Sequence, residues 1–314
     1  MSTVERVSLV LAVPAVLALT GCGEDAPDTM VTTADTVAEV GLQTPESVLH
    51  DTDADVYLVS NINGTPTDED GNGFISRVTP DGEVAALKWI DGQAEGVTLN
   101  APKGMALKGD TLFVTDITHV RAFHRETGEP LESREVPDAT FLNDLAVGPE
   151  GTLYVSDSGL NPDFSTSGTD AIYRFEGGEP VALVQDPALA GPNGLAVTET
   201  GLVFVGFGGA EVRTVGPDGD TEVIAELPGG QLDGVEVLAD GSMLVSSWET
   251  GSVYHVRLGE DDPTAVVSGV PSPADIGWDA DRSRVLIPVF NDDRLIFHTV
   301  SVDPGPGAME QPAY

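Results

Sequence analysis

The chain has little cysteine, histidine and basic charge. Its 314 residues include one cysteine, Cys22, so no disulfide framework is available and the fold must be stable through its core. Its five histidines show no metal-ligand spacing, which disfavours zinc and copper sites. The 14 Lys and Arg residues form no cluster and are outnumbered by 52 Asp and Glu residues, giving a formal net charge of −38. Because phosphate groups are bound by clustered Lys and Arg, this composition excludes nucleic acid as a partner.

The N-terminus carries an apolar stretch, residues 7–19, that is shorter than the ~20 residues needed to span a bilayer and has the length of a signal-peptide core. It ends at Leu19-Thr20-Gly21-Cys22, which is similar to the bacterial lipoprotein cleavage box, where the cysteine becomes the lipid-bearing N-terminus. We therefore predict an exported lipoprotein of the cell envelope, periplasm-facing or anchored in the outer membrane, which touches the membrane only through the lipid on Cys22. A plain signal peptide with a chance cysteine is the alternative.

Composition divides the chain into four parts. We predict a lipoprotein signal peptide at 1–21, an acidic tether at 22–34, a folded domain at 35–304 and a C-terminal tail at 305–314.

The folded domain contains a repeat. Its first landmark is a Pro or Leu, a variable residue, a small or polar residue and an apolar run. The variable residues recur every 40 to 57 residues and are Glu46, Lys103, Asn143, Asn193, Asp233 and Ala274. A second landmark, an apolar segment ending in Val-Ser/Thr-Asp/Asn or a relative of it, follows each of them after 11 to 13 residues. Because the two landmarks recur in register, they predict six copies of one supersecondary unit.

Each unit is predicted to form four short strands separated by turn residues, without a helical period. Six such units are typical of an all-β fold, the six-bladed β-propeller with four antiparallel strands per blade. The last unit shows only three strands, so we expect the N-terminal segment TVAEV, residues 36–40, to complete it and close the ring. The Asn-Gly pair in GPNGLAV, residues 191–197, also predicts a turn, since Asn-Gly is a strong hairpin signal.

The variable residues form the candidate site. The first strand of a propeller blade lines the central channel, and each variable residue is predicted to come just before that strand, so the six side chains should converge at one channel mouth. Two carboxylates and two amides among them suit a hard cation such as Ca²⁺. The alternative is that these residues form turns and bond the backbone. The two longest loops on the same face, residues 60–73 and 158–170, are expected to rim the site.

At these positions the sequence resembles the gluconolactonase/regucalcin family, also called senescence-marker-protein-like, of six-bladed calcium-dependent propellers. The resemblance rests on PES at 45–47, LNDLAV at 142–147, PNGLAV at 192–197 and LDGVEV at 232–237, which occur in the family's order and span most of the mature chain. It implies that Glu46, Asn143, Asn193 and Asp233 bind the metal, and that Asp233 is the general base of lactone hydrolysis. The implied activity is a calcium-dependent hydrolase of small-molecule lactones or esters, which we expect to be a monomer.

Lys103 departs from the family's pattern, in which no ammonium is expected in the second blade. Lys103 can orient the substrate or stabilise an oxyanion, which makes it a second catalytic candidate. It can equally pair with Glu46 and displace the cation. The competing hypothesis is therefore a non-catalytic propeller lipoprotein that binds a ligand or a partner protein, with a structural cation or a Glu46–Lys103 pair in its channel.

The sequence contains one more candidate cation site and two tryptophans near the predicted channel. The stretch DEDGNG, residues 68–73, begins like a calcium loop but has Thr79 where an EF-hand needs Glu, so a solvated loop is favoured over a second cation site at Asp68, Asp70 and Asn72. Trp278 is predicted to be a core residue, and Trp248 a residue of the rim.

Overall fold

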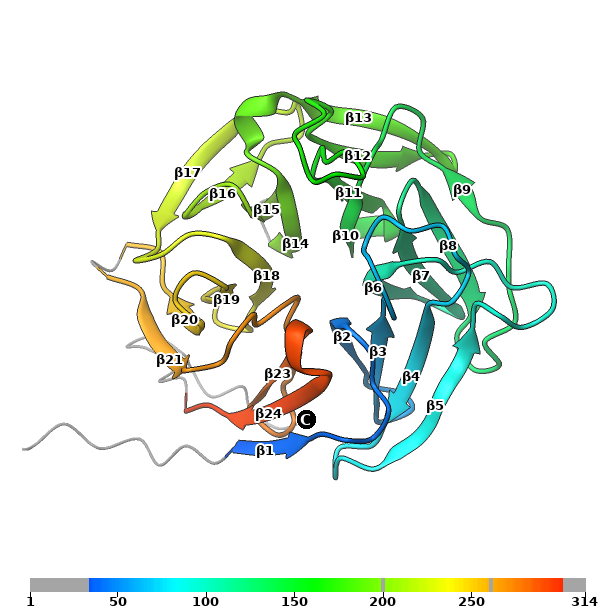
Figure 1. Cartoon of the computed structure of the whole chain (residues 1–314). Coiled ribbons are helices and arrows are strands. Elements are labelled where there is room, and N and C mark those ends of the chain that lie inside the picture. Colours follow the sequence, from blue (N-terminus) through cyan, green and yellow to red (C-terminus); the bar gives the residue numbers. More distant parts are fainter. Residues whose placement is uncertain (1–33, 199–200, 260–261, 302–314) are drawn as a thin grey trace, which may run out of the picture. The chain divides into compact units, whose positions relative to one another are not determined.

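The computed structural model describes residues 34–198, 201–259 and 262–301. These residues form six four-stranded antiparallel sheets arranged around a common axis, so the protein is a six-bladed β-propeller, as the repeat predicts (Figure 1). The predicted signal peptide, Cys22 and the C-terminal tail lie outside the described residues. So does the tether, except for its last residue, Ala34, which belongs to a strand.

The first five blades follow the chain from the axis outward. Their strands are β2 (Pro45–Asp51), β3 (Val56–Asn61), β4 (Phe74–Val78) and β5 (Val84–Asp91) in blade 1; β6 (Pro102–Lys108), β7 (Thr111–Asp116), β8 (His119–His124) and β9 (Arg134–Glu135) in blade 2; β10 (Leu142–Val147), β11 (Leu153–Asp157), β12 (Ala171–Glu176) and β13 (Glu179–Gln185) in blade 3; β14 (Pro192–Thr198), β15 (Gly201–Gly206), β16 (Glu211–Val215) and β17 (Thr221–Glu226) in blade 4; β18 (Leu232–Val237), β19 (Met243–Ser247), β20 (Ser252–Val256) and β21 (Thr264–Ser268) in blade 5.

The sixth blade combines the two ends of the described chain. It consists of β22 (Gly277–Asp279), β23 (Arg284–Val289), β24 (Arg294–Thr299) and the N-terminal β1 (Ala34–Val37). β1 pairs antiparallel with β24, with Val37 opposite Leu295. The predicted ring closure is therefore confirmed, although the strand ends at Val37 and does not reach residue 40. The chain turns there, since Glu39 has a φ of 57°.

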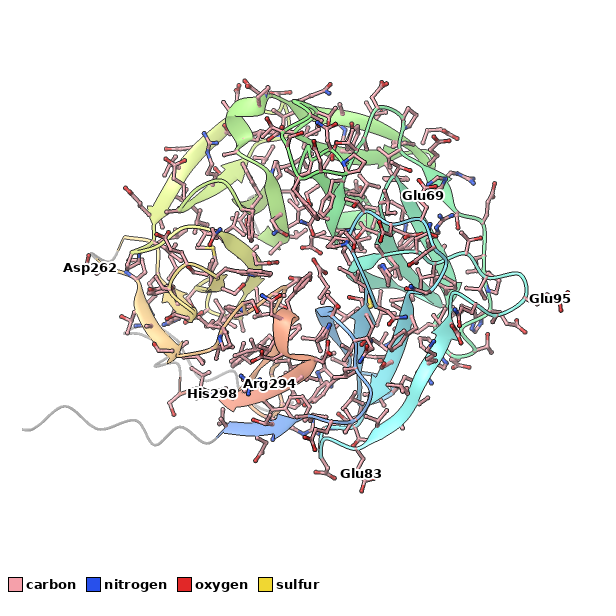
Figure 2. The ribbon with its side chains drawn as sticks, in the orientation of Figure 1. Glu69, Glu83, Glu95, Asp262, Arg294 and His298 are labelled. Atoms are coloured by element: carbon pink, nitrogen blue, oxygen red, sulfur yellow. The ribbon has the colours of Figure 1, made fainter. Side chains whose placement is uncertain are left out.

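The core lies between neighbouring blades. One cluster joins Val203 and Val212 of blade 4 to Val235 and Val245 of blade 5, and the other blade contacts repeat this arrangement. Second strands are therefore almost fully buried, whereas outer strands such as β21 are largely exposed. Acidic side chains of the loops point to solvent, for example Glu69, Glu83, Glu95 and Asp262 (Figure 2).

Helix is confined to three short 3₁₀ turns, η1 (Pro149–Gly151), η2 (Pro187–Leu189) and η3 (Phe290–Asp292), among the residues described. Within that part of the chain, none of the helical segments is long and apolar enough to cross a membrane.

Candidate functional site

β-Bulges direct the variable side chains. In five blades the pairing of the first two strands shifts register across the variable residue, for instance between Pro192 and Leu195. Such a bulge turns a side chain out of the regular alternation of the strand. Asn193 accordingly lies inside β14, as its second residue, and not in a turn, so the hairpin predicted from Asn-Gly is wrong. The expectation that each variable residue precedes its strand is also wrong for five of the six, which lie inside their first strands. It is correct for Ala274, which lies before β22.

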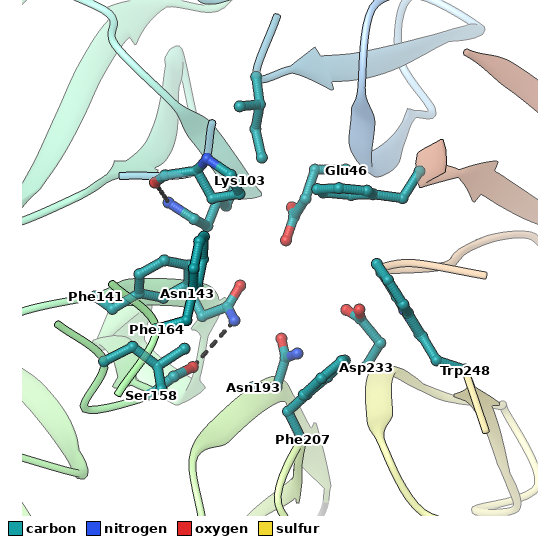
Figure 3. A pocket seen from close by; sticks show the side chains of 14 residues that line it. Glu46, Lys103, Phe141, Asn143, Ser158, Phe164, Asn193, Phe207, Asp233 and Trp248 are labelled. Atoms are coloured by element: carbon teal, nitrogen blue, oxygen red, sulfur yellow. Dashed lines mark hydrogen bonds between the residues drawn. The ribbon is translucent and has the colours of Figure 1, made fainter. Parts of the chain in front are cut away.

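The bulges bring five variable residues to one cavity on the axis. Its volume is about 280 Å³, and its lining includes Glu46, Lys103, Asn143, Asn193 and Asp233 (Figure 3). Ala274 is fully buried and donates its backbone N–H to Pro288 O. The convergence expected for the polar members of the repeat is therefore what the structure shows.

Glu46, Asn143, Asn193 and Asp233, called the oxygen quartet below, contain three buried oxygens without hydrogen-bond partners. These are Glu46 Oε2, Asn193 Oδ1 and Asp233 Oδ1, on side chains that are 3 to 5% exposed. Asn143 Nδ2 donates to Ser158 Oγ at 3.0 Å, which leaves its Oδ1 directed into the cavity (Figure 3). Buried polar atoms are normally paired, because desolvation without a partner costs free energy.

An oxygen-only donor set of this kind fits a hard cation such as Ca²⁺, which takes ~6 to 8 oxygen ligands. No group of three His, Cys, Asp or Glu side chains suited to a metal is present in the described part of the chain. The quartet supplies two carboxylates and two amides in place of such a group. The residues present therefore fit calcium, and a thiolate- or imidazole-binding metal would find no ligands among them.

Burial dominates the electrostatics of the two quartet carboxylates. It raises the pKa of Glu46 well above the usual range, Asp233 and Asp275 raise it further, and Lys103 lowers it. It also raises the pKa of Asp233, with an additional contribution from Asp275. The Trp248 indole and the Asn193 amide lie near enough to favour the Asp233 anion, and so they partly oppose this rise in its pKa. Neither forms a hydrogen bond with Asp233 Oδ1. Both carboxyls are thus strong proton acceptors where no cation balances them.

Hydroxyls of the second strands hold the backbones of Asn143 and Asn193 in place across the blade boundaries. Ser156 Oγ on β11 accepts a hydrogen bond from Asp144 N at 2.9 Å and donates to Asn193 O in blade 4 at 2.7 Å. Thr115 Oγ1 on β7 donates to Asn143 O in blade 3. Each hydroxyl therefore fixes the backbone of a quartet residue in the next blade.

The acidic residue that follows the hydroxyl fixes the loop in front of the first strand. Asp116 Oδ1 accepts from Ala101 N at 2.9 Å, and Asp157 Oδ1 accepts from Phe141 N at 2.8 Å. Sequence reasoning used the Val-Ser/Thr-Asp landmark only to set the register. The recurrence of this landmark is also a signal for the positioning contacts, although the sequence alone does not show which groups the hydroxyl and the carboxylate bind.

Lys103 is 1% exposed and is held by backbone carbonyls. Its Nζ donates to Pro66 O at 3.1 Å and to Ala101 O at 3.2 Å, and lies 4.3 Å from the centroid of the Phe141 ring (Figure 3). It forms no ion pair with Glu46 within 4.0 Å in the part of the chain that the structure describes. Burial lowers the pKa of Lys103 to about 8, and Glu46 and Asp116 partly oppose this shift.

An apolar collar, which the sequence did not predict, surrounds the quartet. It is formed by the loops between second and third strands, together with Phe141, and comprises Ile62, Pro66, Phe141, Leu160, Phe164, Phe207, Trp248 and Phe290. The two long loops predicted to rim the site contribute four of these residues and contact each other, since Thr67 Oγ1 donates to Pro162 O at 3.4 Å. Trp248 lies at the rim as predicted, and Trp278 packs half-buried against the core.

A second acidic layer lies further along the axis, in a cavity of about 220 Å³ that includes Asp144, Glu236 and Asp275. Asp144 accepts from Leu145 N and from Leu195 N, and Asp275 Oδ2 accepts from Ser47 Oγ at 2.5 Å. Burial raises the pKa of Asp275 to about 7 and that of Glu236 to about 8. Sequence reasoning missed this layer, because only the residues at the variable positions were compared between blades.

The loop at 68–73 contains no grouped carboxylates suited to a metal, within the described residues. Its Asp70 accepts hydrogen bonds from both the backbone and the side chain of Asn72, at 3.2 and 2.5 Å. The carboxylate is therefore already engaged inside its own loop.

Comparisons with known proteins give a fold and no closer relative. No protein-family model matches the chain, and no curated protein matches its sequence. Among solved structures, a putative gluconolactonase is 18% identical with a TM-score of 0.64, and the match covers 87% of this chain and 93% of the gluconolactonase chain. A gluconolactonase from Xanthomonas campestris is 17% identical with a TM-score of 0.62, and the match covers 82% of this chain and 86% of that enzyme's chain. Virginiamycin B lyase from Staphylococcus aureus is 14% identical with a TM-score of 0.60, and the match covers 86% of this chain and 99% of the lyase chain. At these identities the likeness shows the fold alone, a six-bladed propeller similar to gluconolactonases and to a streptogramin-type lyase.

Proposed function

We propose that the protein is a calcium-dependent hydrolase of lactones or esters, similar to gluconolactonases and attached to the cell envelope through a lipid on Cys22. The observation that carries the proposal is the set of three unpartnered buried oxygens, Glu46 Oε2, Asn193 Oδ1 and Asp233 Oδ1, that face one cavity. The gluconolactonase neighbours support this reaction type at the level of the fold.

The quartet would hold the cation, and calcium bound there would polarise the carbonyl group of the substrate. Asp233 accepts a proton from the attacking water while the water oxygen bonds to the carbonyl carbon. The bond between that carbon and the ring oxygen then breaks, and the proton passes to the leaving oxygen, giving a hydroxy acid. Burial is the largest cause of the raised pKa of Asp233 in the metal-free protein, and a cation bound to the quartet would lower that pKa again.

Lys103 has a supporting part in this proposal. Two of its three N–H groups are engaged by Pro66 O and Ala101 O, so one remains for a substrate oxygen that gains negative charge. With a pKa of about 8, the ammonium is charged over most of the neutral range.

The test combines metal content with turnover. Purified protein should contain about one calcium per chain, and chelator should abolish hydrolysis of a panel of lactones and aryl esters. Asp233→Asn should lower kcat by at least about 100-fold, the range expected for a lost general base. Asp218→Asn, in an exposed turn on the opposite face, is the matched control and should leave turnover unchanged.

Turnover that resists chelator, or full activity in Asp233→Asn, would overturn the proposal. Bound calcium that raises the melting temperature without any turnover would instead favour a non-catalytic binding propeller. A lyase is disfavoured: a virginiamycin B lyase in which one histidine is replaced by alanine is catalytically inactive, and no histidine lines this cavity in the described chain.

A further inference from the structure

The collar above the quartet forms an aromatic slot. Phe207, Trp248 and Phe290 are in successive contact, with ring centroids 5.4 and 5.2 Å apart. Phe141 and Phe164 lie on the other side of the cavity from Trp248 (Figure 3). Aromatic faces on both sides offer a flat or extended apolar group a large contact area.

Most polar groups of the wall are already engaged. Ser158 Oγ accepts from Asn143 Nδ2 and donates to Pro192 O at 2.7 Å. Lys103 Nζ is directed to two carbonyls and to the Phe141 ring. Above the quartet, two donors of the described lining remain, which are Trp248 Nε1, without a hydrogen-bond partner, and the third N–H of Lys103 Nζ. A polyhydroxylated substrate would therefore leave several hydroxyls in the slot without hydrogen-bond partners, which opposes its binding.

Phe164 is placed to cover an apolar ligand. It lines the cavity and yet is 50% exposed, and its φ of 63° lies in the left-handed region, which is unfavourable for a bulky side chain. Its backbone N–H donates to Asn161 O at 2.8 Å, within a loop that Thr67 ties to the rim loop of blade 1. An exposed aromatic held in a strained conformation over a cavity gains apolar contacts when a ligand fills that cavity.

From these contacts we infer that the site accepts lactones or esters with an apolar body, aryl or long-chain alkyl, in preference to sugar lactones. Phe164 is then a specificity-determining residue. The inference rests on the proposed function for the reaction, but the preference for apolar ligands concerns binding and can be measured separately.

The experiment compares two substrates with the same six-membered ring, δ-dodecanolactone and glucono-δ-lactone, on the calcium-loaded protein. We expect kcat/KM for the alkyl lactone to exceed that for the sugar lactone by about 100-fold or more, since each well-buried methylene contributes to discrimination. Phe164→Ser should lower kcat/KM for the alkyl lactone about tenfold relative to kcat/KM for the sugar lactone. Leu258→Ser, which removes an exposed apolar side chain outside the cavity, should change neither value.

Binding is measured independently of turnover with the δ-lactam that carries the same alkyl chain. The lactam should quench tryptophan fluorescence, Trp248→Phe should abolish that signal, and Phe164→Ser should weaken the affinity about tenfold. Preference for the sugar lactone would overturn the inference and leave the hydrolase standing. Lactam binding that depends on Phe164, without hydrolysis of either lactone, would support the inference and overturn the hydrolase. Neither binding nor turnover would overturn both.

Discussion

The carboxyl groups of the channel are destabilised as anions because the protein removes them from water. Asp275 and Glu236 show this most clearly, with burial as the largest cause of their raised pKa values of about 7 and about 8. Glu236 is only half-buried, but desolvation by the surrounding blades is still the largest effect on its pKa. At neutral pH the folded protein therefore holds protons that the unfolded chain has released.

This difference predicts how stability depends on pH at Glu236. Between the ordinary value of 4.5 and the folded value of about 8, the folded state binds more protons than the unfolded state. The free energy of unfolding therefore falls as the pH rises through this interval. Glu236→Gln removes the titration, so its melting temperature in chelator should equal that of the unchanged protein near pH 4.5 and exceed it at pH 8. A gain of roughly 1 kcal/mol in the free energy of unfolding corresponds to a rise of about 2–4 °C in the melting temperature.

The control for Glu236 is Glu222→Gln, in which an exposed carboxylate of β17 is neutralised. Its melting curve should follow that of the unchanged protein at every pH. If the melting temperatures of Glu236→Gln and the unchanged protein run parallel from pH 4.5 to pH 8, the raised pKa is refuted.

Neighbouring first strands approach each other closely at Gly194 and Gly234, the glycines that follow Asn193 and Asp233. A Cβ added to Gly194 would lie 2.4 Å from Asp233 O, and one added to Gly234 would lie 2.4 Å from Ile276 N. These distances are well below van der Waals contact, and the atoms belong to neighbouring backbones that cannot rotate away. The glycine of the Asn-Gly pair thus serves strand packing and not a turn.

Gly194→Ala should push β18 away from β14 and displace Asp233 relative to Asn193. The expected loss of stability is about 1–3 kcal/mol, the usual cost of overpacking, and calcium affinity should fall at the same time. Thermal unfolding and calcium titration measure the two effects. Gly216→Ala is the matched control, since its added Cβ would meet only Asp220 O at 3.6 Å, an ordinary contact. Unchanged calcium affinity in Gly194→Ala would contradict the close approach.

The repeat could be recognised from the sequence because its landmarks correspond to interactions made in several blades. The hydroxyl of Ser156 and the carboxylate of Asp157, for example, have counterparts in Thr115 and Asp116. The Asn-Gly pair at Asn193 does not form the predicted turn, because a local hairpin signal contains no information on the neighbouring strands that enforce a bulge. The aromatic collar was missed because Phe164, Phe207 and their partners come from loops of different blades without a common spacing.

Ring closure decides whether the propeller has an unprotected sheet edge. β24 is mostly buried and carries Leu295, Ile296 and Phe297 in series, with β1 paired along it (Figure 1). Val37 of β1 belongs to the same core cluster as Leu295 and Phe297. Without β1, a long apolar strand would offer its unpaired N–H and C=O groups to other chains, which is a recognised cause of aggregation.

Two truncations isolate the contribution of β1. A chain that begins at Ala34 and one that begins at Gly41 both lack Cys22, so neither can be lipid-anchored, and they differ only in the closing strand and the turn after it. The shorter chain loses the hydrogen bonds to β24 and the buried Val37, so its melting temperature should be lower by roughly 10 °C, which corresponds to about 3 kcal/mol or more. Size-exclusion chromatography should show a monomer for the chain beginning at Ala34 and higher oligomers for the shorter one. Equal melting temperatures together with two monomers would mean that the remaining three strands of blade 6 close the ring without β1.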